Sequence, residues 1–165
     1  MMKRAMTVAA AAVPVMFMAP AIGSAQPSTV CTAEGLSAET QQDAAPGNQH
    51  TLHIVLTNTS TEACLVQGYP GLDLTGPEDP NGTVYTLPRQ ETGFAPVTVE
   101  PGAAATADLT YLAGGTDGWI PNTIVLTPPD TTTQLVIDWP DGAGSVERQD
   151  GATHPGTFIG PLRPA

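Results

Sequence analysis

Short segments in which apolar and polar residues alternate recur along this chain, and they constrain its fold more than any other feature. Leu52, Ile54 and Leu56 would share one face of an extended segment over 51–57. The same period of two runs through 103–111 and 135–139, where every second residue is apolar. This period is typical of β-strands with one buried face. Weaker strand candidates are 63–66, 72–74, 84–87, 97–99, 123–127 and 157–159.

Residues that form turns separate these segments, at 70–71, 80–82, 101–102, 114–115, 117–118 and 128–130. Only 36–42 is suited to a short helical turn, which Ser37 would cap. Closely spaced strands and turns without a longer helical period predict an antiparallel sandwich. The immunoglobulin signature of a tryptophan between two cysteines is missing, because Trp119 and Trp139 both follow Cys64. We therefore predict an all-β fold, an antiparallel β-sandwich that is immunoglobulin-like at most, with little helix.

The N-terminal region has the composition of a secretory signal peptide. Two cationic residues precede an apolar run over 6–22, and small residues end the run at Ala25. Two prolines interrupt it, which argues against the alternative of a membrane-anchoring helix. We expect cleavage near Ala25, so that 1–25 is a signal peptide and the protein is secreted to the cell envelope or the medium. Residues 26–165 would then form one domain with loosely ordered ends.

The chain is strongly acidic, with 16 Asp and Glu residues against five Lys and Arg residues and a formal net charge of −11. After removal of the signal peptide its cationic side chains are Arg89, Arg148 and Arg163. A surface of this sign repels phosphate backbones and anionic lipids. We therefore predict no nucleic-acid partner and no membrane span. Cations, basic proteins and neutral glycans remain as classes of partner.

Two cysteines, Cys31 and Cys64, follow the signal peptide. In an exported chain the first interpretation is a disulfide between them. Closing a loop of about 33 residues would stabilise the fold by roughly 3–4 kcal/mol in the chain-entropy description. The alternative is a pair of free thiols in redox or metal chemistry, although the sequence holds no close C-x-x-C pair.

One segment, 56–72, concentrates residues with special turn chemistry. Its first strand ends at Asn58, whose side chain can form an Asx turn. Cys64 then begins a returning strand, and Gly68-Tyr69-Pro70-Gly71 follows. Gly68 allows a positive φ, and Tyr69 can pack across the corner that Pro70 and Gly71 make. Each residue has a role in the scaffold, and none is required as a nucleophile or a base.

This segment resembles the signature of a family of secreted actinobacterial domains of unknown function. Other marks of that family follow in order: Cys31 before Leu36, Val-x-Val-x-Pro-Gly-x-x-Ala at 97–104, and Tyr111 near the end of an apolar strand. Members often carry a further cysteine after that strand, where this chain reads Gly-Trp-Ile-Pro at 118–121. The resemblance implies a secreted β-sandwich. It supplies no activity and no catalytic residues.

No set of catalytic or metal-binding residues converges in the sequence. None of the serines lies in a G-x-S-x-G elbow. His50 and His53 are three residues apart, which places them on opposite faces of a strand and disfavours copper. Oxygen ligands of the kind that calcium prefers occur at Asp73, Glu78, Asp79 and Asn81. Their spacing does not match an EF-hand, and a solvated hairpin turn accounts for most of them, so we predict no cofactor and no metal.

Exposed aromatic side chains are the best candidates for ligand contact, and we select Trp119, Tyr69 and Phe94. Trp119 lies in a loop flanked by glycine and proline and is expected to be exposed, whereas Trp139 is expected in the core. We predict a secreted, monomeric, non-catalytic domain that binds an envelope glycan or protein. The alternatives are a calcium or copper carrier, an unrecognised hydrolase, or a structural part of a larger assembly.

Overall fold

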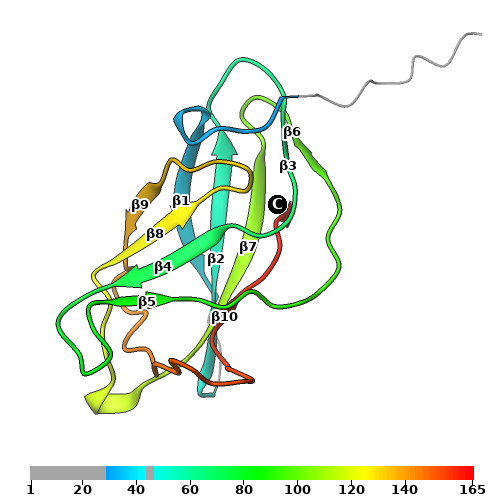
Figure 1. Cartoon of the computed structure of the whole chain (residues 1–165). Helices are drawn as coiled ribbons and strands as arrows, with labels where there is room; N and C mark the ends of the chain where they lie inside the picture. The colour runs from blue at the N-terminus through cyan, green and yellow to red at the C-terminus, as the bar shows by residue number, and fades with distance from the viewer. Residues whose placement is uncertain (1–28, 44–46) are drawn as a thin grey trace, which may run out of the picture.

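The computed structural model describes residues 29–43 and 47–165 (Figure 1). Their strands are β1 (Leu36–Gln42), β2 (Gln49–Asn58), β3 (Cys64–Val66), β4 (Gly71–Thr75), β5 (Val84–Thr86), β6 (Val97–Val99), β7 (Ala104–Leu112), β8 (Thr123–Thr127), β9 (Leu135–Asp138), β10 (Phe158–Ile159) and β11 (Arg163–Pro164). Two short 3-10 helices, η1 (Ala33–Gly35) and η2 (Gly115–Asp117), complete the elements. These residues contain no α-helix, and none of their helical segments has the length and apolarity needed to cross a bilayer. The predicted signal peptide lies outside the described residues.

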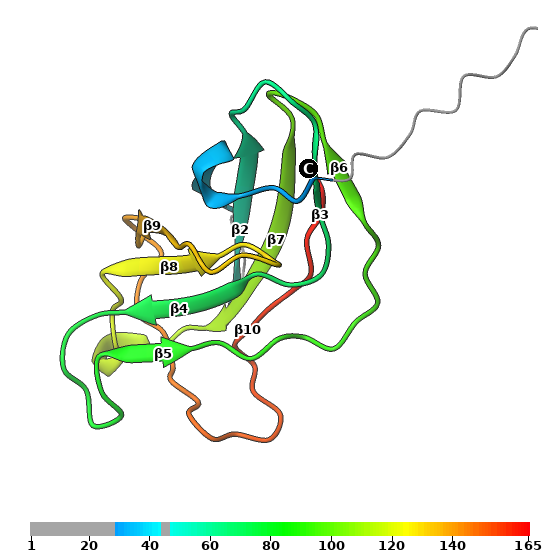
Figure 2. The ribbon, with the colours of Figure 1, turned by 45° about the horizontal axis from the view of Figure 1, so that its top comes forward.

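The strands form three antiparallel sheets. The first sheet has the order β1-β2-β7-β10, with β11 also paired to β7, and the second sheet has the order β5-β4-β8-β9. The small sheet consists of β3 and β6. Strands of the second sheet cross in front of those of the first (Figures 1 and 2). The predicted all-β, antiparallel architecture is confirmed, whereas the immunoglobulin-like arrangement stays a prediction.

The core lies between the first and second sheets. Leu52, Ile54 and Leu56 of β2 are buried, as is the alternating face of β7 that ends at Tyr111. Opposite them the second sheet contributes Leu72, Leu74, Ile124 and Leu126. The alternation in the sequence therefore predicted the inward faces of β2 and β7 correctly, because successive side chains of a strand point to opposite sides of a sheet.

The expectation of a helical turn over 36–42 is wrong. These residues form β1, which pairs along its whole length with β2, from Leu36 opposite Asn58 to Gln42 opposite Leu52. Leu36 is buried and Ala38 packs against the core, a period of two rather than of a helix. A seven-residue ladder satisfies the backbone of β1 and buries its apolar face, and this tertiary pairing outweighs the local capping preference of Ser37.

The predicted disulfide joins Cys31 and Cys64. It fixes the segment before β1 to the start of β3, where the Cys31 N–H also donates to the Leu65 carbonyl at 3.0 Å. Asn58 forms the predicted Asx turn, since its Oδ1 accepts the Ser60 N–H at 2.9 Å. The disulfide thus ties the start of β3 to the segment before β1, and the Asn58 side chain ties the end of β2 to the loop that leads into β3.

The segment 141–155, between β9 and β10, contains no strand but contributes to the core. Ala143, Ser145 and Val146 are buried. The Val146 N–H donates to the Trp119 carbonyl at 2.7 Å, which ties this segment to the connection between β7 and β8. The residues that follow Val146 reach the β4–β5 hairpin, and Arg148 makes that contact.

Candidate functional site

Two of the three predicted ligand contacts, Tyr69 and Phe94, line one open groove of about 910 Å³. Three connections build it: 67–69 between β3 and β4, 88–94 between β5 and β6, and 129–130 between β8 and β9. Figure 2 shows the β5–β6 connection swinging out to one side of the molecule before it returns as β6. We call this site the Tyr69–Phe94 groove; its lining is Gln67, Gly68, Tyr69, Pro88, Arg89, Glu91, Thr92, Phe94, Pro129 and Asp130.

The aromatic pair is held by backbone contacts that the sequence did not reveal. The Tyr69 hydroxyl donates to the Thr92 carbonyl and accepts the Thr92 N–H at 2.9 Å. The Phe94 ring meets Tyr69 edge to face, with ring centroids 5.6 Å apart and planes at 82°. This is a favoured geometry for aromatic pairs. Phe94 nevertheless remains 50% exposed, so an apolar surface faces the solvent inside the groove.

Gly68 fixes the direction in which Tyr69 leaves β3. Its φ of +94° lies in the region that side chains rarely adopt, as the sequence predicted. An added Cβ would meet the Phe94 ring only at 3.9 Å, an ordinary contact, so the backbone angle rather than space requires glycine. The Gly68 carbonyl accepts the Leu162 N–H at 2.8 Å, which anchors this wall of the groove to the segment between β10 and β11.

Polar side chains of both signs share the lining of the groove. Arg89 is exposed and makes no ion pair within residues 29–43 and 47–165, in contrast to Arg148 and Arg163. The backbone beneath it is fixed, because Ile159 of β10 donates to the Pro88 carbonyl and accepts the Gln90 N–H, both at 2.9 Å. Glu91 and Asp130 add carboxylates. The groove therefore offers charged hydrogen-bonding groups around one half-exposed ring, with the backbone on either side of Arg89 held by β10.

The expectation that Trp119 is exposed is wrong. Trp119 is only 8% exposed, its indole N–H donates to the Pro77 carbonyl at 2.9 Å, and its ring packs against Gly76. The Arg148 guanidinium lies 4.9 Å from the Trp119 ring centre. Turn-forming neighbours indicate a loop, but they do not say whether the loop is covered, and here the β4–β5 hairpin covers it. Trp139 is buried, as predicted.

The candidate calcium ligands lie in and around the β4–β5 hairpin. Asp73 lies within β4, opposite Thr86, and Glu78 is exposed on the hairpin loop. Asp79 closes the turn, where its Oδ1 accepts the Asn81 N–H at 2.9 Å. Within the described ranges no three His, Cys, Asp or Glu side chains gather in a way that could hold a metal ion.

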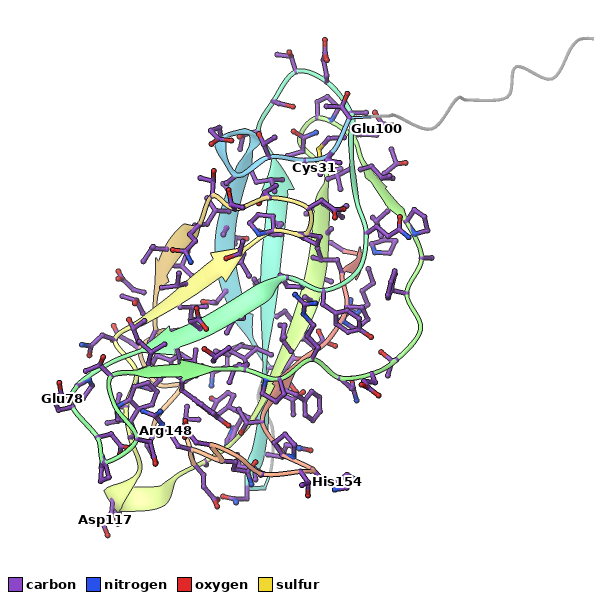
Figure 3. The ribbon with its side chains drawn as sticks, in the orientation of Figure 1. Cys31, Glu78, Glu100, Asp117, Arg148 and His154 are labelled. Carbon is purple, nitrogen blue, oxygen red and sulfur yellow. A yellow bond between two sulfur atoms is a disulfide. The ribbon has the colours of Figure 1, made fainter. Side chains whose placement is uncertain are left out.

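Arg148, which sequence analysis did not single out, occupies the inner side of that hairpin. Figure 3 shows it beside the loop that carries Glu78 and far from Cys31. Its guanidinium donates to the carbonyls of Asn81, Gly82 and Val84 and forms a two-pronged pair with Asp150. The hydrogen bond to Asp150 raises the pKa of Arg148, and the same bond lowers the pKa of Asp150. The carbonyl groups on this side of the hairpin are thus already paired with an internal cation.

The histidines lie apart, as their spacing predicted. His50 stacks on the buried Tyr111, with ring centroids 5.4 Å apart, whereas His53 on the other face of β2 contacts Asp43 and Asp108. Of the serines, Ser60 donates to the Asn58 Oδ1 and Ser145 donates to the Gly115 carbonyl. No hydrogen bond in the described part of the chain joins a serine to a histidine.

Comparison with known proteins places the sequence in a family. A family model described as "Domain of unknown function (DUF4232)" matches residues 31–157, a span that begins at the first disulfide cysteine and includes β1 to β9. None of the curated proteins matches the chain, and none of the solved structures does.

Proposed function

We propose that this chain, which belongs to the DUF4232 family, is a secreted, monomeric, non-catalytic domain that binds an envelope glycan in the Tyr69–Phe94 groove. We also propose that its two larger sheets form an immunoglobulin-like sandwich. The observation that carries it is the half-exposed Phe94 ring, set by Tyr69 inside a groove with amide, guanidinium and carboxylate groups. The Cys31–Cys64 disulfide supports secretion, because such bonds persist in oxidising compartments.

The chemistry of the lining favours a glycan over a protein. A flat aromatic face packs well against the C–H face of a sugar ring, and a few convergent polar groups fix the orientation of a ligand in a mainly apolar groove. The lining also has amide, guanidinium and carboxylate side chains, each of which can bind two neighbouring hydroxyl groups of a sugar. These side chains are Gln67, Arg89, Glu91 and Asp130. Protein interfaces, in contrast, are depleted in Asp and Glu relative to the rest of the surface. The acidic net charge disfavours polyanionic polymers, so the glycan is neutral or carries amino groups.

Replacing Phe94 with alanine should weaken binding to such a glycan by at least about fivefold, because a central aromatic contact is worth more than about 1 kcal/mol. The measurement is a titration of purified mature protein with neutral and amino-sugar polysaccharides from bacterial envelopes. Ile120→Ala is the matched control, since Ile120 is 55% exposed and lies outside the groove lining. It should leave affinity within about twofold, a change that corresponds to a few tenths of a kcal/mol.

The possible outcomes test the chemical class of the ligand and its place of binding separately. A glycan that binds the native protein and Phe94→Ala equally well would exclude the groove as its site. If no glycan binds but an exported protein does, in a Phe94-dependent manner, the ligand class is protein. If neither a glycan nor an exported protein binds the native protein, the binding function itself is wrong.

A further inference from the structure

His53 lies between two carboxylates that come from different strands. Its Nδ1 is 2.7 Å from Asp108 Oδ1, and its Nε2 is 2.8 Å from Asp43 Oδ2. His53 and Asp108 are directly opposite each other in the β2–β7 ladder, whereas Asp43 follows the last residue of β1. The imidazole therefore bridges the end of β1 to β7 across the outer face of the first sheet.

The two contacts fix how many protons the ring carries. An ionised carboxylate only accepts hydrogen bonds, so each ring nitrogen must donate one. A neutral imidazole has one N–H and one acceptor nitrogen, and it can make only one of these two bonds. Both contacts are satisfied together when the ring is an imidazolium. The two N···O distances thus indicate an imidazolium ring at His53.

The charged groups around His53 also favour the imidazolium form of its ring. The hydrogen bond to Asp43, followed by that to Asp108, raises the pKa of His53 above its ordinary value. Burial raises the pKa of Asp108, but hydrogen bonds from Arg163 and His53 outweigh it and lower that pKa. Arg163 of β11 donates to Asp108 at 2.7 Å, and Glu39 of β1 lines the same shallow groove as His53. Asp43, Glu39, Asp108 and Arg163 are thus the charged groups that face His53.

We propose that His53, Asp43 and Asp108 form a proton-dependent clasp that fastens the end of β1 to the sheet. When the ring loses its extra proton, the Nδ1–H bond to Asp108 is retained, because Arg163 holds that carboxylate in place. Nε2 then turns a lone pair toward Asp43, whose side chain is 70% exposed and has no other hydrogen bond within the described residues. The Asp43 contact breaks and the residue that follows β1 is released, whereas Gln42 remains paired with Leu52 of β2.

The direction of the pH dependence follows from the two pKa shifts. Since the pKa of His53 is raised on folding, the clasp contributes fully below the ordinary histidine pKa of about 6.5, and its contribution is lost as pH rises through the raised value. The contribution of Asp108 is lost at the acid end, as pH falls through its lowered pKa. The clasp is therefore closed in mildly acidic surroundings and opens as pH rises through the raised pKa of His53.

An NMR titration of the whole mature protein tests this. The midpoint of His53 should lie above the ordinary histidine pKa. The amide signals of Gln42 and Asp43 should move with the His53 midpoint. In Asp43→Asn the His53 midpoint should fall toward the ordinary histidine value, and the coupled transition at residue 42 should disappear. Asp141→Asn, at an exposed carboxylate outside the cluster, should leave both unchanged.

Either of two results would overturn the clasp. One is a His53 midpoint in the native protein at or below the ordinary histidine pKa. The other is an Asp43→Asn variant whose His53 midpoint and residue 42 transition match the native ones. Asp43 lies at the surface, so this variant should remain folded and the comparison stays informative.

Discussion

Replacing Arg148 with alanine should lower the free energy of unfolding by about 2–4 kcal/mol, because a nearly buried side chain loses its hydrogen bonds to three carbonyls and its packing on two rings. The Arg148 side chain is only 4% exposed and lies within cation–π distance of both the Tyr85 and the Trp119 rings. Its loss leaves Asp150 without its guanidinium and three hairpin carbonyls without their donor. Urea denaturation followed by tryptophan fluorescence measures the change.

Two further variants test the assignment of this cost to Arg148. Arg148→Lys keeps the charge but lacks the planar fork, so its loss of stability should fall between that of the native protein and that of Arg148→Ala. Arg89→Ala removes an exposed arginine and should change stability by no more than about 0.5 kcal/mol. Faster hydrogen exchange at the Gly76 and Gly82 amides, both bonded within the β4–β5 hairpin, should accompany Arg148→Ala alone. Equal stability of the two alanine variants would contradict this account.

Asn58→Ala should cost about 2–4 kcal/mol, because buried partners are left unpaired. Asn58 is fully buried, and its amide donates to the Glu62 and Val99 carbonyls at 2.8 Å each. Its Oδ1 accepts both the N–H and the hydroxyl of Ser60. All four hydrogen bonds of the side chain are made, and a methyl group replaces none of them. Thermal denaturation by circular dichroism gives the measurement.

An aspartate at position 58 distinguishes the hydrogen bonds that the Asn58 amide donates from its role as acceptor in the Asx turn. Asn58→Asp keeps an acceptor for Ser60 but cannot donate to Val99 and buries a charge, so it should be at least as damaging as Asn58→Ala. Asn81→Ala, at an exposed asparagine of the hairpin, should be nearly neutral. An Asn58→Asp protein as stable as the native one would show that the Asx turn, rather than the contacts with β6 and Glu62, supplies the stabilisation.

The strands that sequence analysis predicted best are those whose pattern reflects burial on one side. β2 and β7 pair along nine residues, each with a repeating apolar face, and both were predicted within a few residues of their bounds. β1 was missed because its sequence, LSAETQQ, is mostly polar and holds a favourable local cap. Only the neighbouring β2 makes it a strand, and no local pattern encodes that neighbour.

The candidate site was predictable only in part. Tyr69 and Phe94 were selected as aromatic residues, but their contact depends on the β5–β6 connection returning to the β3–β4 corner after the β4–β5 hairpin. The clasp and the Arg148 contacts depend likewise on pairs distant in sequence, such as His53 with Asp108 or Arg148 with Asn81. The sequence identifies these residues only as polar, whereas their contacts depend on which strands and loops the fold places side by side.

The first sheet has a consequence for how the molecule acquires its structure. β2 pairs with β7, where the opposed His53 and Asp108 are 55 residues apart in the sequence, and β7 is completed only by β10 and β11. Contacts of such high sequence separation make folding slow, on the scale of milliseconds to seconds. The first sheet is therefore complete only after the segment up to Pro164 has been synthesised, and until then β7 presents an open hydrogen-bonding edge to any other extended strand.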